Sequence, residues 1–194
     1  MNSIYKVKFS EYLDCAEKHL KGCKSLLSSY MFFLQVKDKM PKKEKTNDLQ
    51  VWLEVYYLSG YIIEGVTVYA AYKLNNWNKD KDIETGCDET FTKKTNLDFY
   101  PNRSTTLFFR TRNGLCVKSH NFQGIIKALL KNNPSFKDVP YIGDGKIDSM
   151  VERLLDEWKP KMRYEYKNNL NLDQDIVKRL IDVCDEIFRC SINI

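Results

Sequence analysis

A long apolar helix with glycines at its centre constrains the fold of this chain more than any other feature. Asn47 or Asp48 can cap it, and it should run to about Asn75. One side carries apolar residues at helical spacing: Leu49, Trp52, Tyr56, Ile63, Val66 and Ala70. Gly60 and Gly65 each cost about 1 kcal/mol relative to alanine inside a helix. We expect close approach of a neighbouring helix to offset that cost, so this segment should be the central helix of a bundle.

Two further segments show the same periodicity over four or more turns. The first runs from Ser10, a plausible N-cap, to about Gln35, and a lysine-rich loop with Pro41 follows it. The last runs from about Leu172 to Phe188, and its expected core residues are Ile176, Leu180, Ile181, Val183, Cys184 and Ile187.

Shorter helices are expected between these long ones. A short helix should span Asn121 to Leu130 and stop before Pro134. Ser149 and Glu152 form a capping-box pattern that opens another helix, which Pro160 should kink or break. Its expected apolar residues are Val151, Leu154, Leu155, Trp158 and Met162.

Residues 76–118 lose helical periodicity and are expected to form an irregular insert or a short hairpin, with Leu107, Phe108 and Phe109 as its strand-like core. Only 8 of the 194 residues are glycine and 5 are proline, which argues against a many-turned all-β fold. We therefore predict a single all-α domain over residues 1–194. It should be an up-and-down bundle of four or five helices, with the insert between the second and third main helices.

Targeting and redox signals point to a soluble cytoplasmic protein. The N-terminus lacks the apolar region of a secretory signal, and the stretch Tyr56 to Tyr72 holds Glu64 and is too short and polar to cross a bilayer. The 6 cysteines show no CxxC spacing, which favours free thiols. Cys15 and Cys23 flank His19, but lie about 12 Å apart along a helix, too far to share one ion. No metal and no cofactor is predicted.

Three segments, in this order along the chain, resemble the HEPN (higher eukaryote and prokaryote nucleotide-binding) family of small helical bundles. Residues 57–66, YLSGYIIEGV, are similar to the family's central helix with its small residues and inward glutamate, here Glu64. Residues 118–122, KSHNF, are similar to the entry to its third helix, and residues 158–164, WKPKMRY, to its "W…RY" segment.

The resemblance implies a cytoplasmic homodimer that partners a small nucleotidyltransferase in a toxin–antitoxin or defence system. Many members of the family are metal-independent ribonucleases with an Arg-x(4–6)-His motif, in which Arg binds the scissile phosphate and His moves protons. On this basis the catalytic candidates are His120 and Arg163. The chain departs from the motif, because Arg112 precedes His120 by seven intervening residues and no histidine follows Arg163.

Charge placement marks a candidate binding region independently of any family. No acidic residue lies between Asp98 and Asp138, whereas this stretch holds Arg103, Arg110, Arg112, Lys118, Lys127, Lys131 and Lys137. Aromatic residues are interleaved with these bases: Phe99, Tyr100, Phe108, Phe109 and Phe122. This composition is typical of surfaces where cations meet phosphates and bases stack on rings. The alternative is a solvated loop whose phenylalanines plug the bundle.

The beginning of the 121–130 helix is a second candidate site. Amide protons at a helix N-terminus attract anions, which His120 and Asn121 could help to bind. Alternatively, His120 caps the helix or pairs with Glu64, since an inward carboxylate needs a partner. Arg163 is the other candidate partner, and we predict a Glu64–His120–Arg163 cluster.

The function that follows is a HEPN-like module that binds a nucleotide, RNA or a partner protein without catalysis of its own. Its expected nucleotide- or RNA-binding residues are Arg103, Arg110, Arg112, Lys118, Asn121 and Tyr164. Two alternatives stay open: a ribonuclease toxin that uses His120 with an arginine, and a structural interaction domain that presents Trp and Phe residues on its surface.

Overall fold

The computed structural model describes residues 7–36, 48–74, 78–80, 97–101, 107–111, 116–118, 126, 129–130, 139–140, 145–164 and 172–194. Its helices are α1 (Phe9–Val36), α2 (Asp48–Leu74), α5 (Ser149–Glu157), the 3-10 helix η3 (Pro160–Tyr164) and α6 (Gln174–Ile192). Its strands are β1 (Leu97–Pro101), β2 (Leu107–Thr111) and β3 (Cys116–Lys118). Among the described residues, no helix combines the length and the apolar character that crossing a membrane requires.

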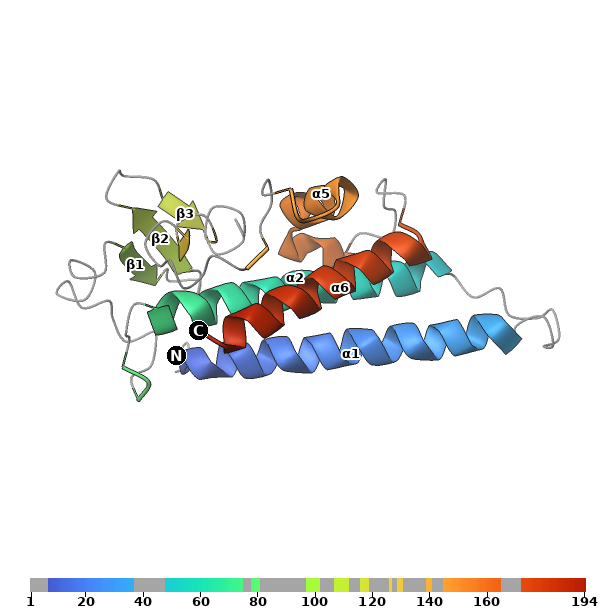
Figure 1. Cartoon of the computed structure of the whole chain (residues 1–194), viewed down its shortest axis with the longest axis horizontal. Coiled ribbons are helices and arrows are strands. Elements are labelled where there is room, and N and C mark those ends of the chain that lie inside the picture. Colours follow the sequence, from blue (N-terminus) through green and yellow to red (C-terminus); the bar gives the residue numbers. More distant parts are fainter. Residues whose placement is uncertain are drawn as a thin grey trace.

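Three long helices, α1, α2 and α6, lie along one another and form the body of the fold (Figure 1). The chain runs in opposite directions along α1 and α2, whereas α6 follows the direction of α2 (Figure 1). α5 packs on α6 and η3 packs on α2, both on the side away from α1. The predicted helical bundle is therefore confirmed.

α2 is the central helix, as its composition predicts. It contacts α1, α6 and η3. Residues on several sides of it are almost fully buried, including Val55, Tyr56, Ile62, Ile63, Val66, Ala70 and Ala71. A helix that is apolar all round belongs in the interior of a bundle, and burial of these side chains is the main source of its stability.

The two central glycines of α2 serve two different contacts. A Cβ atom on Gly65 would lie 2.5 Å from the backbone oxygen of Tyr12 and 3.0 Å from the Cβ of Ala16. Gly65 therefore permits the close approach of α1 that the sequence predicts. Gly60 differs, because its space is taken by the indole of Trp158 rather than by a helix.

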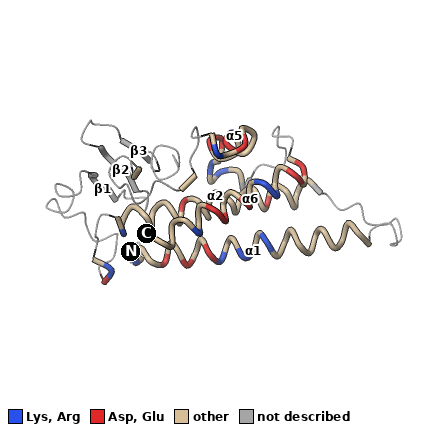
Figure 2. The backbone as a smooth tube through the Cα atoms, viewed as in Figure 1, with Lys and Arg blue, Asp and Glu red and all other residues tan. Residues whose placement is uncertain are grey.

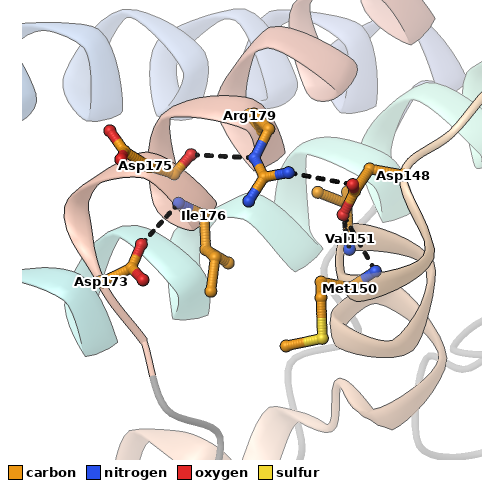
Figure 3. Close-up of polar contacts among 7 residues, drawn as sticks. All are labelled: Asp148, Met150, Val151, Asp173, Asp175, Ile176 and Arg179. Carbon is orange, nitrogen blue, oxygen red and sulfur yellow. Dashed lines mark hydrogen bonds and ion pairs between the residues drawn. The ribbon is translucent and has the colours of Figure 1, made fainter.

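The helix ends show how local sequence sets the boundaries. α5 begins after Asp148, whose carboxylate accepts the amide protons of Met150 and Val151 at 3.0 and 3.4 Å (Figure 3). The prediction that Ser149 caps this helix is thus wrong by one residue. Asp148 also forms an ion pair of 2.9 Å with Arg179 of α6, so the cap is tied to the neighbouring helix (Figure 3).

The other boundaries are close to those expected. The N-cap prediction at Ser10 is wrong, because α1 already begins at Phe9 and the carboxylate of Glu11 accepts the amide proton of Lys8 at 3.0 Å. α6 starts after the N-cap Asp173 and continues four residues beyond the expected end at Phe188. α5 ends at Glu157, and the chain becomes extended at Trp158 before Pro160, as predicted.

The short helix expected at 121–130 is described at three residues only. Ile126, Leu129 and Leu130 are helical, and the first two are buried in the core. The rest of that segment lies outside the described residues.

The described part of the insert is a small antiparallel sheet with the strand order β1-β2-β3. Its β1–β2 pair agrees with the hairpin alternative, extended by a third strand, and the irregular alternative is corrected for these strands. Leu107, Phe108 and Phe109 lie in β2, the central strand, as their strand-like character suggests. The sheet lies at the end of the bundle where α1 begins and where α2 and α6 end (Figure 1).

The register of the sheet separates its residues into two faces, because successive residues of a strand alternate in direction and directly opposite residues share a face. One face holds Leu97, Phe99, Pro101, Leu107, Phe109, Thr111 and Val117. The other holds Asp98, Tyr100, Phe108, Arg110, Cys116 and Lys118. The first face is apolar except for Thr111, whereas the second mixes aromatic and charged residues. We call the second the basic–aromatic face.

Candidate functional site

The basic–aromatic face brings together residues that the sequence marks for nucleotide or RNA binding. In the register, Phe108 lies opposite Tyr100 on one side and Lys118 on the other. Arg110, two residues along β2, lies opposite Asp98 and Cys116. Two aromatic and two basic residues therefore occupy adjacent positions of one small sheet. Asp98, which directly precedes the acid-free stretch of the sequence, is the one carboxylate among the residues of this face.

The remaining predicted binding and catalytic residues are only partly placed. Arg103, Arg112, His120 and Asn121 lie outside the described residues. Arg163 and Tyr164 form the last two residues of η3. Of the predicted site residues, the structure thus brings Arg110 and Lys118 together and assigns Arg163 and Tyr164 to the element that packs on α2.

Trp158 fixes the chain that enters η3. Its indole is 1% exposed, fills the space over Gly60 and donates a hydrogen bond of 3.1 Å from Nε1 to the carbonyl oxygen of Tyr57. Since Trp158 lies two residues before the first residue of η3, this contact holds the start of η3 against the middle of α2. The tryptophan of the "W…RY" segment therefore has a structural role.

An aromatic cluster surrounds this contact and includes residues that sequence reasoning did not assign to a site. Tyr61 lies edge-on to both Tyr57 and Trp158, with ring centroids 5.1 and 5.2 Å apart. The hydroxyl groups of Tyr57 and Tyr61 are 2.9 Å apart and hydrogen-bonded. From α1, the imidazole of His19 lies 5.8 Å from the Tyr61 ring. A signal was present in the sequence, because Tyr57 and Tyr61 are four residues apart, about one helical turn, on the helix that also carries Gly60.

Two of the three residues of the predicted Glu64–His120–Arg163 cluster lie on described elements. Glu64 lies on α2 and is half-buried, and Arg163 belongs to η3, which packs on α2. His120 is outside the described residues. The cluster therefore stays a prediction, and the described packing puts two of its three members on contacting elements.

Burial shifts the pKa values of three titratable groups at the junction of α1, α2 and α6. Desolvation, reinforced by the nearby charge of Lys18, lowers the pKa of His19. Burial and, to a smaller extent, Glu54 raise the pKa of the Cys23 thiol to about 12. Burial also raises the pKa of Cys184, with smaller effects of Cys23 and Asp185. At neutral pH, His19 is thus biased toward the neutral imidazole and both cysteines stay protonated.

The Cys15, His19 and Cys23 series does not form one continuous surface. Cys15 is exposed, His19 is half-buried, and Cys23 is buried with its thiol 3.8 Å from the carbonyl oxygen of Val55. Within the described part of the chain, no three His, Cys, Asp or Glu residues come together in a way that could hold a metal ion.

The large aromatic residues of the bundle mostly belong to its core. Trp52 and Trp158 are buried, as are Phe9 and Phe188, whereas Phe32 is exposed. An interaction surface built on tryptophans is therefore not found among the described residues. Comparison of the chain with protein-family models, with curated proteins and with solved structures finds no match.

Proposed function

We propose that this protein is a HEPN-like helical module that binds single-stranded RNA through the basic–aromatic face of its sheet. The observation that carries the proposal is the register that sets Tyr100 and Phe108 beside Arg110 and Lys118. The resemblance of three segments to the HEPN family supports a role in RNA or nucleotide recognition.

The chemistry of these residues suits a flexible, single-stranded ligand. An unpaired base can stack on an aromatic ring, which contributes about 1–3 kcal/mol per base and tolerates any sequence. Arginine and lysine neutralise the phosphates on either side and release counterions. Splayed bases on the aromatic residues of a small sheet are a common mode of RNA recognition.

The composition of the two faces supports the choice of the basic–aromatic face as the one that binds RNA. Leu97, Phe99, Leu107, Phe109 and Val117 share the opposite face, which is suited to packing against apolar groups. The basic–aromatic face is then the one available to a ligand.

Other predicted binding residues lie close to these strands in the sequence. Arg103 belongs to the segment between β1 and β2, and Arg112 directly follows β2. His120 and Asn121 come shortly after β3. We include these residues in the proposed RNA path.

Titration of a fluorescent single-stranded RNA, followed by anisotropy, tests the proposal. Replacing both basic residues (Arg110→Gln with Lys118→Gln) should weaken binding by at least about tenfold, since two phosphate contacts are lost. A charge-matched control, Lys21→Gln with Lys178→Gln, alters exposed positions on α1 and α6 and should leave affinity within about twofold. Equal losses in the two double variants would contradict a defined site.

Asp98 provides a test of opposite sign. Because Asp98 lies opposite Arg110 in the register, Asp98→Asn should tighten RNA binding by removing a like charge from the path of the phosphates. The loss-of-binding variants could fail through misfolding, but a gain of affinity could not be explained that way. Unchanged or weaker binding by Asp98→Asn would argue against this face.

The same mixtures separate binding from cleavage. RNA recovered intact supports a binding module, whereas cleavage that is lost in His120→Ala and Arg163→Ala would establish the ribonuclease alternative. The proposal also includes a small nucleotidyltransferase as a protein partner in a toxin–antitoxin or defence system. Co-purification of that enzyme with the tagged chain would test this partner.

A further inference from the structure

Two cysteines from opposite ends of the chain meet the same part of α2. Cys23 of α1 and Cys184 of α6 are buried, and both thiols are free. The thiol of Cys23 donates to the carbonyl oxygen of Val55 at 3.8 Å, and the thiol of Cys184 donates to that of Ser59 at 3.9 Å. Val55 and Ser59 are four residues apart, about one turn of α2. The two thiols therefore approach α2 at nearly the same level, from two neighbouring helices.

The residues that directly follow these cysteines are joined at the surface. Lys24 and Asp185 form an ion pair of 2.6 Å between α1 and α6. Lys24 is the last charged residue of α1, and Figure 2 shows the rest of that helix without charged positions. Since α1 and α6 contact each other, this ion pair marks where they meet. It brings the preceding residues, Cys23 and Cys184, to adjoining positions on the inner side of the α1–α6 contact.

Small side chains at this level let the three helices approach closely. Cys23, Ser59 and Cys184 all have 0% of their area exposed. Burial and, to a smaller extent, the neighbouring Cys23 raise the pKa of the Cys184 thiol, as expected for thiols near each other. A disulfide joins Cα atoms that are about 4.4–6.8 Å apart. Packed helices with axes about 8–10 Å apart place facing Cα atoms at such distances.

We propose that Cys23 and Cys184 form an oxidisable pair, which a small peroxide such as hydrogen peroxide converts into a disulfide between α1 and α6. One sulfur, as the thiolate, attacks a peroxide oxygen. An S–O bond forms, the O–O bond breaks, and the leaving hydroxide takes up a proton to become water. The second sulfur then attacks the sulfenic acid, so that the S–S bond forms, the S–O bond breaks and a second water leaves. The pair loses two hydrogen atoms, and one peroxide becomes two waters.

The closed core makes this reaction slow, and its product locks the bundle. Because burial keeps both thiols protonated, the attacking thiolate forms when α1 and α6 transiently separate. The disulfide then joins two segments that lie far apart in the sequence and restricts the unfolded chain. Oxidation should therefore raise the thermal midpoint by about 10 °C. The inference does not rest on the proposed RNA site, and it is tested without RNA.

Peptide mapping of the oxidised full chain tests the pairing. The chain is treated with hydrogen peroxide in urea just below the unfolding transition, where the bundle opens often but stays mainly folded. Remaining thiols are then alkylated after unfolding, and the chain is digested without reductant. The Cys23–Cys184 link should exceed the Cys15–Cys23 and Cys184–Cys190 links by at least about tenfold, although loop closure favours these short-range pairs. Oxidation in fully unfolding urea is the control and should reverse this preference.

Substitutions separate the cross-link from other oxidation. Cys23→Ala and Cys184→Ala should each abolish the rise of the thermal midpoint on oxidation, whereas Cys15→Ser, at an exposed position, should keep it. If an alanine variant does not fold, the peptide map of the wild-type chain still decides. Cys23 and Cys184 that stay reduced while Cys15 is oxidised would overturn the proposal. Preferential pairing of either buried cysteine with another cysteine in the folded chain would also overturn it.

Discussion

The indole of Trp158 occupies the space that any side chain at Gly60 would need. The two residues lie far apart in the sequence, and their contact joins the segment that enters η3 to the centre of α2. Because Trp158 is 1% exposed and also hydrogen-bonded to the Tyr57 carbonyl, it has little freedom to move away.

Gly60→Ala should destabilise the protein although alanine favours helices. The added methyl group would overlap the indole, and overpacking of this kind costs about 1–3 kcal/mol or more. Gly22→Ala is the matched control, because a Cβ there meets nothing within 4 Å and should add about 0.5–1 kcal/mol of stability. Urea unfolding followed by circular dichroism measures both. Equal stability of the two variants would mean that Trp158 does not occupy this space.

Tyr56→Phe should destabilise the contact between α2 and α5. The buried hydroxyl of Tyr56 donates a hydrogen bond of 2.7 Å to the carbonyl oxygen of Leu154. Its removal leaves that acceptor without the bond and should cost about 1–3 kcal/mol. Tyr57→Phe, which removes a hydroxyl from a half-buried ring, should cost less. A larger loss in Tyr57→Phe than in Tyr56→Phe would be inconsistent with this geometry.

His19 should make folding sensitive to mild acid. Its pKa is lowered in the folded state by burial and by Lys18, so the unfolded chain binds the proton more readily. The stability that neutral His19 contributes is therefore fully present above the unfolded pKa near 6.5, and it is lost as the pH falls below that value. Unfolding free energies measured between pH 7 and pH 5 should decline less steeply in His19→Gln. His120→Gln controls for the other histidine, and identical slopes in His19→Gln and the wild type would exclude this role.

The buried thiols should be unreactive until the protein unfolds. Burial raises the pKa of Cys23 to about 12 and also raises that of Cys184, whereas Cys15 is exposed. Alkylation at mildly alkaline pH, read by mass spectrometry, should label Cys15 quickly and the other two slowly. The raised pKa values also predict that stability is complete below the unfolded value of 9.0 and falls as the pH approaches 12. Labelling of Cys23 in the folded state at the rate of Cys15 would show that α1 and α2 separate.

The long helices could be predicted from the sequence because the pattern that specifies each of them lies within its own segment. Apolar residues at helical spacing place α1, α2 and α6 to within a few residues, and proline at 160 ends α5 as expected. The sequence pattern favours Ser149 over the true N-cap of α5, Asp148, because both residue types can cap a helix. The ion pair of Asp148 with Arg179, on a distant segment, is part of what the sequence pattern did not reveal.

The features that the sequence does not predict depend on contacts between segments that are distant in the sequence. Glycine at position 60 indicated a close neighbour, but nothing local identifies that neighbour as Trp158. The strands are short, and their pairing depends on register across the insert, so only the centre of β2 was recognisable. For the same reason, the sequence located the charged and aromatic residues of the candidate site but did not divide them between two faces.

The salt dependence of RNA affinity tests the central proposal most directly. For the wild-type chain, the logarithm of the association constant for a single-stranded RNA should fall linearly with the logarithm of salt concentration. Replacing Arg110 and Lys118 with glutamine should reduce the magnitude of that slope by about 1.4, because each lost phosphate contact removes about 0.7. Lys21→Gln with Lys178→Gln should leave the slope unchanged. Absence of salt-dependent binding, or a slope that the sheet variants do not change, would contradict RNA recognition by the basic–aromatic face.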